Sequence, residues 1–303
     1  MKRIVAVTLM LWAATCFAQG QQAAPPAESR FSTNQTVHEN APSYSDLYCA
    51  GFLSKEIVHR IGSVTGGMYS PDETQFSRGS TIFVSGSDLK EGDQYSVVRE
   101  MKDPNHYEPF IGQKSALAAV GEPYAELGRL KIVAIRGGVG VAQVEFSCQN
   151  ITLGDIVIPF NEHAPVEFKK SGTLVRFSPG PGHLKSRIVM AKEFDAVVGA
   201  GQIVYLDAGS NKGVKTGMYF RAVRGYDPAT LNAIDNLSYK APVGEDTQKV
   251  PGTVTPQAAK TLPPRNLGEM IVLNTTQTSA TAMITTSFEP IQVGDWAEME
   301  DEQ

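Results

Sequence analysis

An internal duplication constrains this chain more than any other feature of its sequence. The block 127–133 (LGRLKIV) is matched by 267–272 (LGEMIV), and in each copy a Gly-Asp pair follows 26 residues after the glycine of the block. These pairs are Gly154, Asp155, Gly294 and Asp295. Self-similarity at a fixed spacing indicates one structural unit that occurs twice.

Two further blocks lie upstream, in the same order in each copy. Residues 92–99 (GDQYSVVR) match 217–224 (GMYFRAVR), and 82–84 (IFV) corresponds to 203–205 (IVY). Four blocks in one order, found twice, predict that both copies fold alike.

The local pattern in each copy is typical of β-structure. Residues 130–135 and 139–146 are strand-like runs on either side of a Gly-Gly pair at 137–138, which is a hairpin signal. In the second copy, 270–273 and 280–285 play the same parts. Short strands with no long helical pattern between them predict an all-β chain of two tandem small, SH3-like β-barrels.

The copies differ most in one loop, which follows block 92–99 in the first copy and block 217–224 in the second. The first copy has a predicted short helix over 113–120, ended by Gly121. The second copy has a helix-start pair, Asp227-Pro228, and then a Pro-rich loop at 239–265 that we expect to be mobile.

The first 18 residues have the features of a secretory signal peptide. Lys2 and Arg3 precede an apolar run at 4–14, and small residues precede a cleavage site after Ala18. The alternative is a lipoprotein acylated at Cys16. No later stretch is apolar for about 18 residues, so no transmembrane anchor is expected.

The remainder of the chain divides by composition. Residues 19–46 are rich in Gln, Ala, Pro, Ser and Asn, and predict a disordered tether. The other predicted parts are β-barrel repeat 1 at 47–160, a linker at 161–184, and β-barrel repeat 2 at 185–299.

Two cysteines, Cys49 and Cys148, remain after signal removal. In an oxidising compartment an even pair is a disulfide candidate, and the alternative is two buried free thiols. We place Cys49 at the first strand of the first barrel and Cys148 at the end of a late strand, and such strands commonly lie side by side. Phe288 replaces Cys148 in the second copy, which we expect to fold by apolar burial alone.

The charge balance bears on the class of partner. Removing Lys2 and Arg3 from the 27 basic residues leaves 25 against 32 acidic ones, a net charge of about −7. A mildly acidic chain lacks the basic footprint that nucleic acids require, so no nucleic-acid partner is expected.

No catalytic or metal-ligating constellation occurs in the sequence. It has no Gly-x-Ser-x-Gly elbow and no His-x-x-x-His or paired-cysteine spacing, and its five histidines fall outside the repeated blocks. We therefore predict no enzymatic activity, no metal and no cofactor, and interpret the histidines as surface residues.

The repeated polar residues are interpreted as structural. In each Gly-Asp pair the glycine would adopt a positive φ and the aspartate would bond its own backbone, with a metal-binding carboxylate as the alternative. Arg99 and Arg224 are expected to fix a strand against a loop carbonyl or carboxylate, with partner binding as the alternative. The predicted turn residues are Gly92, Asp93, Gly154, Asp155, Gly209, Ser210, Gly213, Gly217, Gly294 and Asp295.

The strongest local motif is 209–217 (GSNKGVKTG), which reads as a Gly-Ser turn and a one-turn excursion before the next strand. With the later Gly-Asp pair, it resembles the small β-barrels of bacterial envelope scaffolds: the C-terminal domain of the flagellar assembly protein T family and the β domains of the rod-shape protein MreC. It is also similar to uncharacterised exported bacterial proteins, some of which carry LysM peptidoglycan-binding modules. In the first copy, 85–92 is a shortened form. The resemblance covers roughly 80–160 and 185–299 and implies fold more than partner.

These features predict a non-enzymatic envelope interaction or scaffold protein, secreted across the inner membrane to the periplasm or cell surface. Its partner would be an envelope protein or a cell-wall glycan. One alternative is a peptidoglycan- or polysaccharide-binding module, and a second is an enzyme with a site between the repeats. We expect any specific binding site in the unrepeated loops, 100–124 and 225–265.

Overall fold

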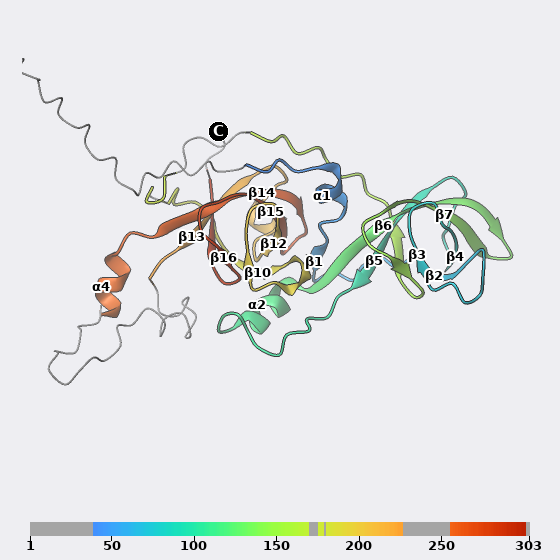
Figure 1. The fold of residues 1–303 in the computed structure, drawn as a ribbon, viewed down its shortest axis with the longest axis horizontal. Coiled ribbons are helices and arrows are strands. Elements are labelled where there is room, and N and C mark those ends of the chain that lie inside the picture. Colours follow the sequence, from blue (N-terminus) through green and yellow to red (C-terminus); the bar gives the residue numbers. More distant parts are fainter. Residues whose placement is uncertain (1–38, 170–174, 179, 227–254, 301–303) are drawn as a thin grey trace, which may run out of the picture. The chain divides into compact units, whose positions relative to one another are not determined.

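A computed structural model describes residues 39–169, 175–178, 180–226 and 255–300, and most of its regular structure is β-strand (Figure 1). The predicted signal peptide, most of the predicted tether and the Asp227-Pro228 pair lie outside these residues. The all-β, two-barrel prediction is confirmed, because two separate sets of six antiparallel strands each close on themselves.

In the first barrel, six strands close in the order β6-β5-β9-β2-β4-β7, because β7 also pairs with β6. A short extra strand, β1 (Phe52–Ser54), adds to β6 outside the ring. The barrel strands are β2 (Gly62–Gly67), β4 (Thr81–Gly86), β5 (Gln94–Glu100), β6 (Glu122–Arg136), β7 (Val139–Ser147) and β9 (Ile156–Pro159).

The second barrel repeats this connectivity, with the strand order β10-β12-β15-β14-β13-β17. A two-stranded ribbon accompanies each barrel, β3 (Gln75–Phe76) with β8 (Ile151–Thr152) and β11 (Val197–Val198) with β16 (Ile291–Gln292). The barrel strands are β10 (Lys185–Ala191), β12 (Ile203–Leu206), β13 (Tyr219–Arg224), β14 (Arg265–Thr275), β15 (Ala280–Ser287) and β17 (Trp296–Met299).

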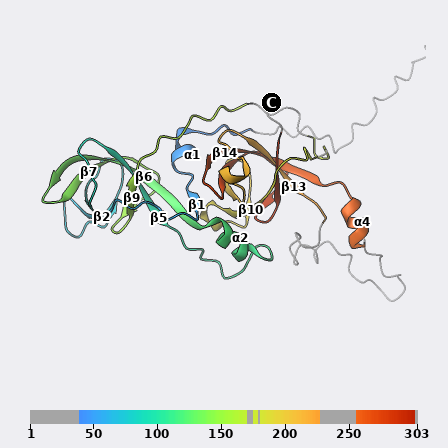
Figure 2. The ribbon, with the colours of Figure 1, turned by 180° about the vertical axis from the view of Figure 1, so that it is seen from behind.

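The described helices are short. Helix α2 lies against β10, as Figures 1 and 2 show from opposite sides. The helical segments are α1 (Tyr44–Tyr48), α2 (Gln113–Val120), η1 (Lys192–Phe194), η2 (Ser210–Lys212) and α4 (Pro256–Thr261).

Strand register shows that the two copies are the same fold in detail. A β-bulge interrupts β5–β6 between Val97 and Val98, and a bulge interrupts β13–β14 at the matching step. Opposite each bulge stands a glycine, Gly128 or Gly268, whose Cα faces the next strand so closely that an added Cβ would overlap a carbonyl oxygen. The Leu-Gly block therefore recurs because only glycine permits this close approach.

One aligned block requires a correction. Ile82 faces Ala142, and Val204 faces Ala282, the equivalent alanine. The block 82–84 therefore corresponds to 204–206, one residue later than the sequence comparison predicted. Because side chains alternate across a strand, this shift exchanges inward and outward positions.

Several local predictions are confirmed. Helix α2 covers the predicted residues and ends at Gly121, whose φ is 112°. The β6–β7 hairpin turns at Gly137 and Gly138, with φ values of 58° and 80°, as a two-residue primed turn requires.

Two predictions of irregular chain are wrong in part. Helix α1 begins inside the predicted disordered tether at 19–46, where Ser43 and Asp46 form a reciprocal capping box. Helix α4 lies inside the predicted mobile Pro-rich loop, where Thr255 caps the helix and Pro256 occupies its first position. Composition concealed both helices because each is only one to two turns long.

The two apolar cores differ in how self-contained they are. The first-barrel core is formed by its own residues, such as Leu130 and Ile132. The second-barrel core also includes Ala50, Leu53 and other residues from the first half of the chain. The second core is thus shared with residues outside the second copy, and the prediction that this copy folds without a bridge, by apolar burial alone, stays a prediction.

Replacing Gly268 by alanine is expected to lower the free energy of unfolding by about 2 kcal/mol or more, because the new Cβ would overlap the Thr286 carbonyl oxygen. Gly199→Ala is the matched control, since no atom lies within 4 Å of its added Cβ. Urea unfolding of both variants measures the difference. Equal midpoints for the two variants would contradict the close-approach explanation.

Candidate functional site

The predicted Gly-Asp turns and arginines form one repeated structural clamp. Arg99 donates from Nε and Nη2 to the two Asp155 oxygens at 2.7 and 2.8 Å, and Arg224 does the same to Asp295 at 2.8 and 2.6 Å. The preceding glycine, Gly154 or Gly294, has a positive φ in each case. Both carboxylates are buried, and the pKa of Arg99 is raised, mainly by its hydrogen bond to Asp155.

In each barrel this clamp fastens the end of one strand, β5 in the first and β13 in the second, to the turn that contains the Gly-Asp pair. Each aspartate also accepts from the backbone N–H three residues before it, Thr152 at 2.6 Å or Gln292 at 2.7 Å. Each arginine reaches one loop carbonyl as well, that of Asn150 or Pro290. The carboxylate oxygens are thus used by the fold, which matches the turn interpretation rather than the metal alternative.

The other predicted turn residues also shape the chain. Gly92 and Gly217, both with φ of 88°, precede the equivalent strands β5 and β13, and Gly92 is followed by Asp93. Gly213 ends η2 with φ of 84°.

Gly209 and Ser210 lie against the β14–β15 hairpin loop. An added Cβ on Gly209 would lie 2.5 Å from the Ser279 nitrogen, and the Ser210 N–H donates to the Thr276 carbonyl at 2.9 Å. The Gly-Ser turn of the strongest motif therefore supports the hairpin loop that carries Ser279, and Ser279 Oγ donates to the Leu53 carbonyl.

Cys49 and Cys148 are joined in a disulfide, with Cα atoms 5.6 Å apart. The expected reason for their meeting is wrong. Cys49 caps α1 and precedes β1, which is outside the barrel ring, so it is not in the first barrel strand. The bridge instead attaches residues 49–54, called the strap below, to the end of β7.

Hydroxyl groups of the second barrel hold the strap by its backbone. The Ala50 carbonyl accepts from Tyr205 Oη at 2.8 Å and the Leu53 carbonyl from Ser279 Oγ at 2.8 Å. Between them, the Gly51 carbonyl accepts from Thr281 Oγ1 at 3.0 Å, and all three bonds are buried. A segment bonded by disulfide to one barrel is thus hydrogen-bonded to the other.

The loop 100–124 was expected to carry a specific binding site. Several of its residues contact the second barrel. Gln113 Nε2 donates to the Val189 carbonyl at 2.9 Å in a buried bond. Phe110 packs against Gly294, and the guanidinium carbon of Arg187 lies 4.0 Å from the centre of its ring. These contacts fasten α2 to the second barrel, while Tyr107 and Ile111 of the same loop are exposed, and a binding site in this loop stays a prediction.

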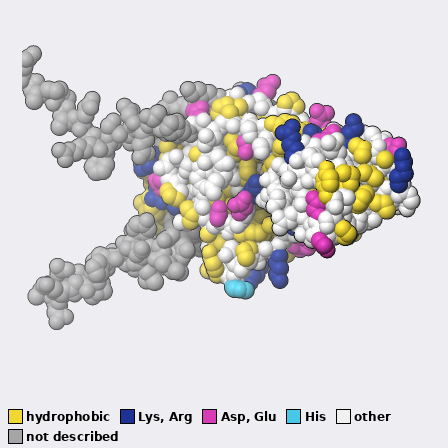
Figure 3. All heavy atoms as spheres, turned by 45° about the vertical axis from the view of Figure 1, so that its right-hand side comes forward, with side chains coloured by type: hydrophobic (Ala, Val, Ile, Leu, Met, Phe, Trp, Pro, Cys, Tyr) yellow, Lys and Arg dark blue, Asp and Glu magenta, His cyan; other side chains and the backbone are white. Residues whose placement is uncertain are grey.

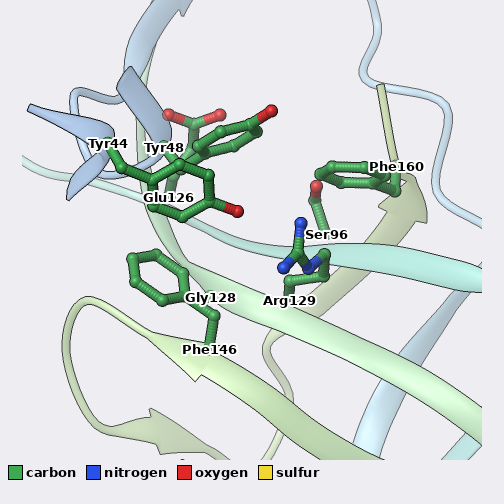
Figure 4. A pocket seen from close by; sticks show the side chains of 8 residues that line it. All are labelled: Tyr44, Tyr48, Ser96, Glu126, Gly128, Arg129, Phe146 and Phe160. Atoms are coloured by element: carbon green, nitrogen blue, oxygen red, sulfur yellow. The ribbon is translucent and has the colours of Figure 1, made fainter. Parts of the chain in front are cut away.

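A shallow recess lies on the outer surface of β5, β6 and β7, and sequence reasoning missed it (Figure 4). Aromatic side chains from α1, from β7 and from the segment after β9 surround the Arg129 guanidinium. The lining residues are Tyr44, Tyr48, Ser96, Glu126, Gly128, Arg129, Phe146 and Phe160.

The guanidinium of Arg129 is the centre of this recess. Its carbon lies 5.0 Å from the Phe160 ring centre and 6.0 Å from that of Tyr48. Its Nε is buried without a hydrogen bond, and its ion pair with Glu145 is long, at 3.7 Å. Gln94 Nε2 donates a hydrogen bond to the same Glu145 oxygen at 2.6 Å.

Glu126 connects the recess to the strap. One of its oxygens accepts from the Gly51 N–H at 3.0 Å, and the other lies 3.6 Å from His163 Nε2. His163 also packs edge-on against Tyr48, with ring centres 4.8 Å apart. His163, expected at the surface, is instead mostly covered at the margin of the recess.

The equivalent place in the second barrel is occupied differently. There Arg221 bonds Glu300 at 2.8 Å, and both side chains are largely buried, so an ion pair occupies the position. By strand register, the equivalent pairs are Ser96 and Arg221, Arg129 and Glu269, Phe146 and Thr286, and Phe160 and Glu300.

Comparisons with known proteins do not identify a function for this chain. No known protein-family model matches the chain, and no curated protein is similar to it. Within the described ranges, no helix is long and apolar enough to cross a membrane. The same ranges contain no group of three or more His, Cys, Asp or Glu side chains placed to hold a metal ion.

Tyr205→Phe is expected to lower the free energy of unfolding by about 1–3 kcal/mol at neutral pH, because the buried Ala50 carbonyl loses its donor. Burial raises the pKa of Tyr205 above its ordinary value of about 10. The unfolded state therefore ionises first, and the wild-type protein should lose stability as the pH rises above about 10.

Denaturant titrations from about pH 8 to about pH 11 measure both effects. The loss above pH 10 should be shallower in Tyr205→Phe than in the wild type, while exposed Tyr69→Phe should follow the wild type. Identical slopes in all three proteins would show that Tyr205 is not held neutral by burial.

Proposed function

We propose that this chain is a non-enzymatic interaction or scaffold protein of the bacterial cell envelope, exported across the inner membrane. The Cys49–Cys148 disulfide supports an oxidising location, where such bonds persist. Its partner would be another envelope protein.

The observation that carries this proposal is a difference between equivalent faces of the two barrels. In the second barrel, Tyr205, Ser279 and Thr281 face outward and hold the strap. The equivalent first-barrel positions are Phe83, Val139 and Val141, which lack those hydroxyls.

This face of the first barrel is apolar and accessible. Val139 is 36% exposed and Val133, on the neighbouring strand β6, is 50% exposed. Figure 3 shows hydrophobic side chains gathered on the first-barrel surface, with Lys and Arg side chains nearby. Exposed apolar patches of this kind mark protein–protein contact surfaces.

Saccharide binding is the second candidate function. The recess around Arg129 favours it, because aromatic faces combined with a few polar groups are typical of small-ligand sites. The two functions use different surfaces and can be tested separately.

Export predicts a mature protein that begins at Gln19 and has no free thiol. Intact-mass spectrometry of protein from the native host should give the mass of residues 19–303, and alkylation should modify Cys49 and Cys148 only after reduction. Recovery of the full-length chain, or of two alkylatable thiols before reduction, would contradict export to an oxidising compartment.

A Val133→Asp/Val139→Asp double variant is expected to lose its envelope-protein partner while keeping its fold, because both positions are exposed. Quantitative co-purification from crosslinked envelopes measures the loss, and circular dichroism checks the fold. Val197→Asp, at a 51% exposed position on β11, is the matched control. An unchanged partner set in the double variant would exclude this face.

A further inference from the structure

We propose that the apolar outer face of the first barrel binds a second copy of this chain, so that molecules associate head to tail. This face, called the open face below, consists of Phe83, Val133, Val139, Val141 and Leu153. The element that docks on it would be the turn at 175–178 of the second copy, called the apolar turn. The inference rests on the proposed protein interaction at this face and names its partner.

The second barrel shows what covers the equivalent face there. Its Tyr205, Ser279 and Thr281 hydroxyls bond the carbonyls of the strap, and Phe110 packs against Gly294. All of these covering residues belong to the first half of the chain. The molecule thus already contains one interface in which this barrel face receives a segment of another repeat.

The equivalent positions of the first barrel are exposed. Ser279 is buried, whereas its equivalent Val139 is exposed. Val293, which precedes the Gly294 turn, is buried in the second core, whereas its equivalent Leu153 is 43% exposed.

The glycines of the two Gly-Asp turns show the same difference. A Cβ added to Gly294 would lie 2.9 Å from the Phe110 ring, but no described atom lies within 4 Å of a Cβ added to Gly154. The face that the first half of the chain covers on the second barrel is therefore left uncovered on the first barrel by the described residues.

The apolar turn is the counterpart of the strap in the second repeat. Glu126 and Asn266 each stand directly before a Leu-Gly pair, and Glu126 accepts from the Gly51 N–H of the strap. Asn266 donates from Nδ2 to the Val175 carbonyl at 2.6 Å and from its backbone N–H to the Arg176 carbonyl at 2.8 Å. The apolar turn therefore lies beside the start of β14 as the strap lies beside the start of β6.

The apolar turn presents its side chains to solvent. Leu53 of the strap is fully buried in the second core, whereas Val175 and Phe177 are 53% and 56% exposed. The Ser178 N–H donates to the Val175 carbonyl at 3.1 Å and closes the turn. Two exposed apolar side chains on a turn that is already ordered lose little conformational freedom when they dock.

The chemistry of the open face suits the apolar turn better than it suits a strap. Strap carbonyls need donors, which the second barrel supplies as hydroxyl groups. Two carbonyls of the apolar turn are already bonded to Asn266, so its apolar side chains are the groups left to bury. The open face offers Phe83, Val139 and Val141 at the positions of the three hydroxyl residues.

Sedimentation velocity of the full mature protein, from about 1 μM to about 1 mM, tests the proposal. The wild type should associate as its concentration rises. Because the two surfaces differ, the contact is heterologous, and each molecule can bind one neighbour through each surface. A wild-type protein that stays monomeric over this range would overturn the proposal.

Two variants distinguish head-to-tail association from a symmetric dimer. Val133→Asp/Val139→Asp, which alters the open face, and Val175→Asp/Phe177→Asp, which alters the apolar turn, should each be monomeric alone. An equimolar mixture should form a dimer and nothing larger, because each variant retains the surface that the other lacks. This recovery also shows that both variants are folded.

Tyr107→Asp, at a 60% exposed position in the loop between β5 and α2, is the matched control and should associate as the wild type does. A mixture of the two double variants that stays monomeric would overturn the head-to-tail contact. So would wild-type association in either double variant alone.

The outcome is separable from that of the proposed envelope interaction. If the wild type is monomeric while Val133→Asp/Val139→Asp loses an envelope partner in co-purification, only the identity of the partner is wrong. If the mixture forms the dimer while the crosslinked partner set is unchanged in that variant, self-association stands and the envelope interaction at this face is wrong.

Discussion

Backbone carbonyl groups that are buried must be hydrogen-bonded, and hydroxyl groups on β12, on β15 and in the loop before β15 meet this requirement for the strap. The remaining features depend on this arrangement. The disulfide attaches the strap to β7, the Gly209 turn supports the hairpin loop that carries Ser279, and Leu53 enters the second core. Glu126 extends the same network to the recess through the Gly51 N–H.

Much of the fold could be predicted because its determinants are local and occur twice. Gly128 and Gly268 mark a close approach of strands, Gly137 and Gly138 fix a hairpin, and Gly121 ends α2. Each requirement acts over a few residues and therefore leaves a readable trace in the sequence. The one-residue error at 82–84 arose because apolar residues occupy successive positions there, so alternation could not fix the register.

The strap and the recess could not be predicted, because both depend on contacts between distant residues. Strap residues and Thr281 are separated by more than two hundred positions, and the hydroxyls involved look like ordinary strand threonine and serine. Tyr44 of α1 lies in the segment 19–46, whose composition resembles disorder. A usable signal did exist at Arg129, since its aligned partner Glu269 reverses the charge directly after the shared Leu-Gly pair.

The strap has an evolutionary consequence. A newly duplicated domain can be lost again without harm, because each copy contains its own core. Here the segment preceding the first copy completes the core of the second, and the first copy's disulfide keeps it in place. Deleting the first copy would therefore remove part of the core of the second, whereas the first-barrel core consists of its own residues. The dependence runs in one direction, so the second copy could not be inherited without the first.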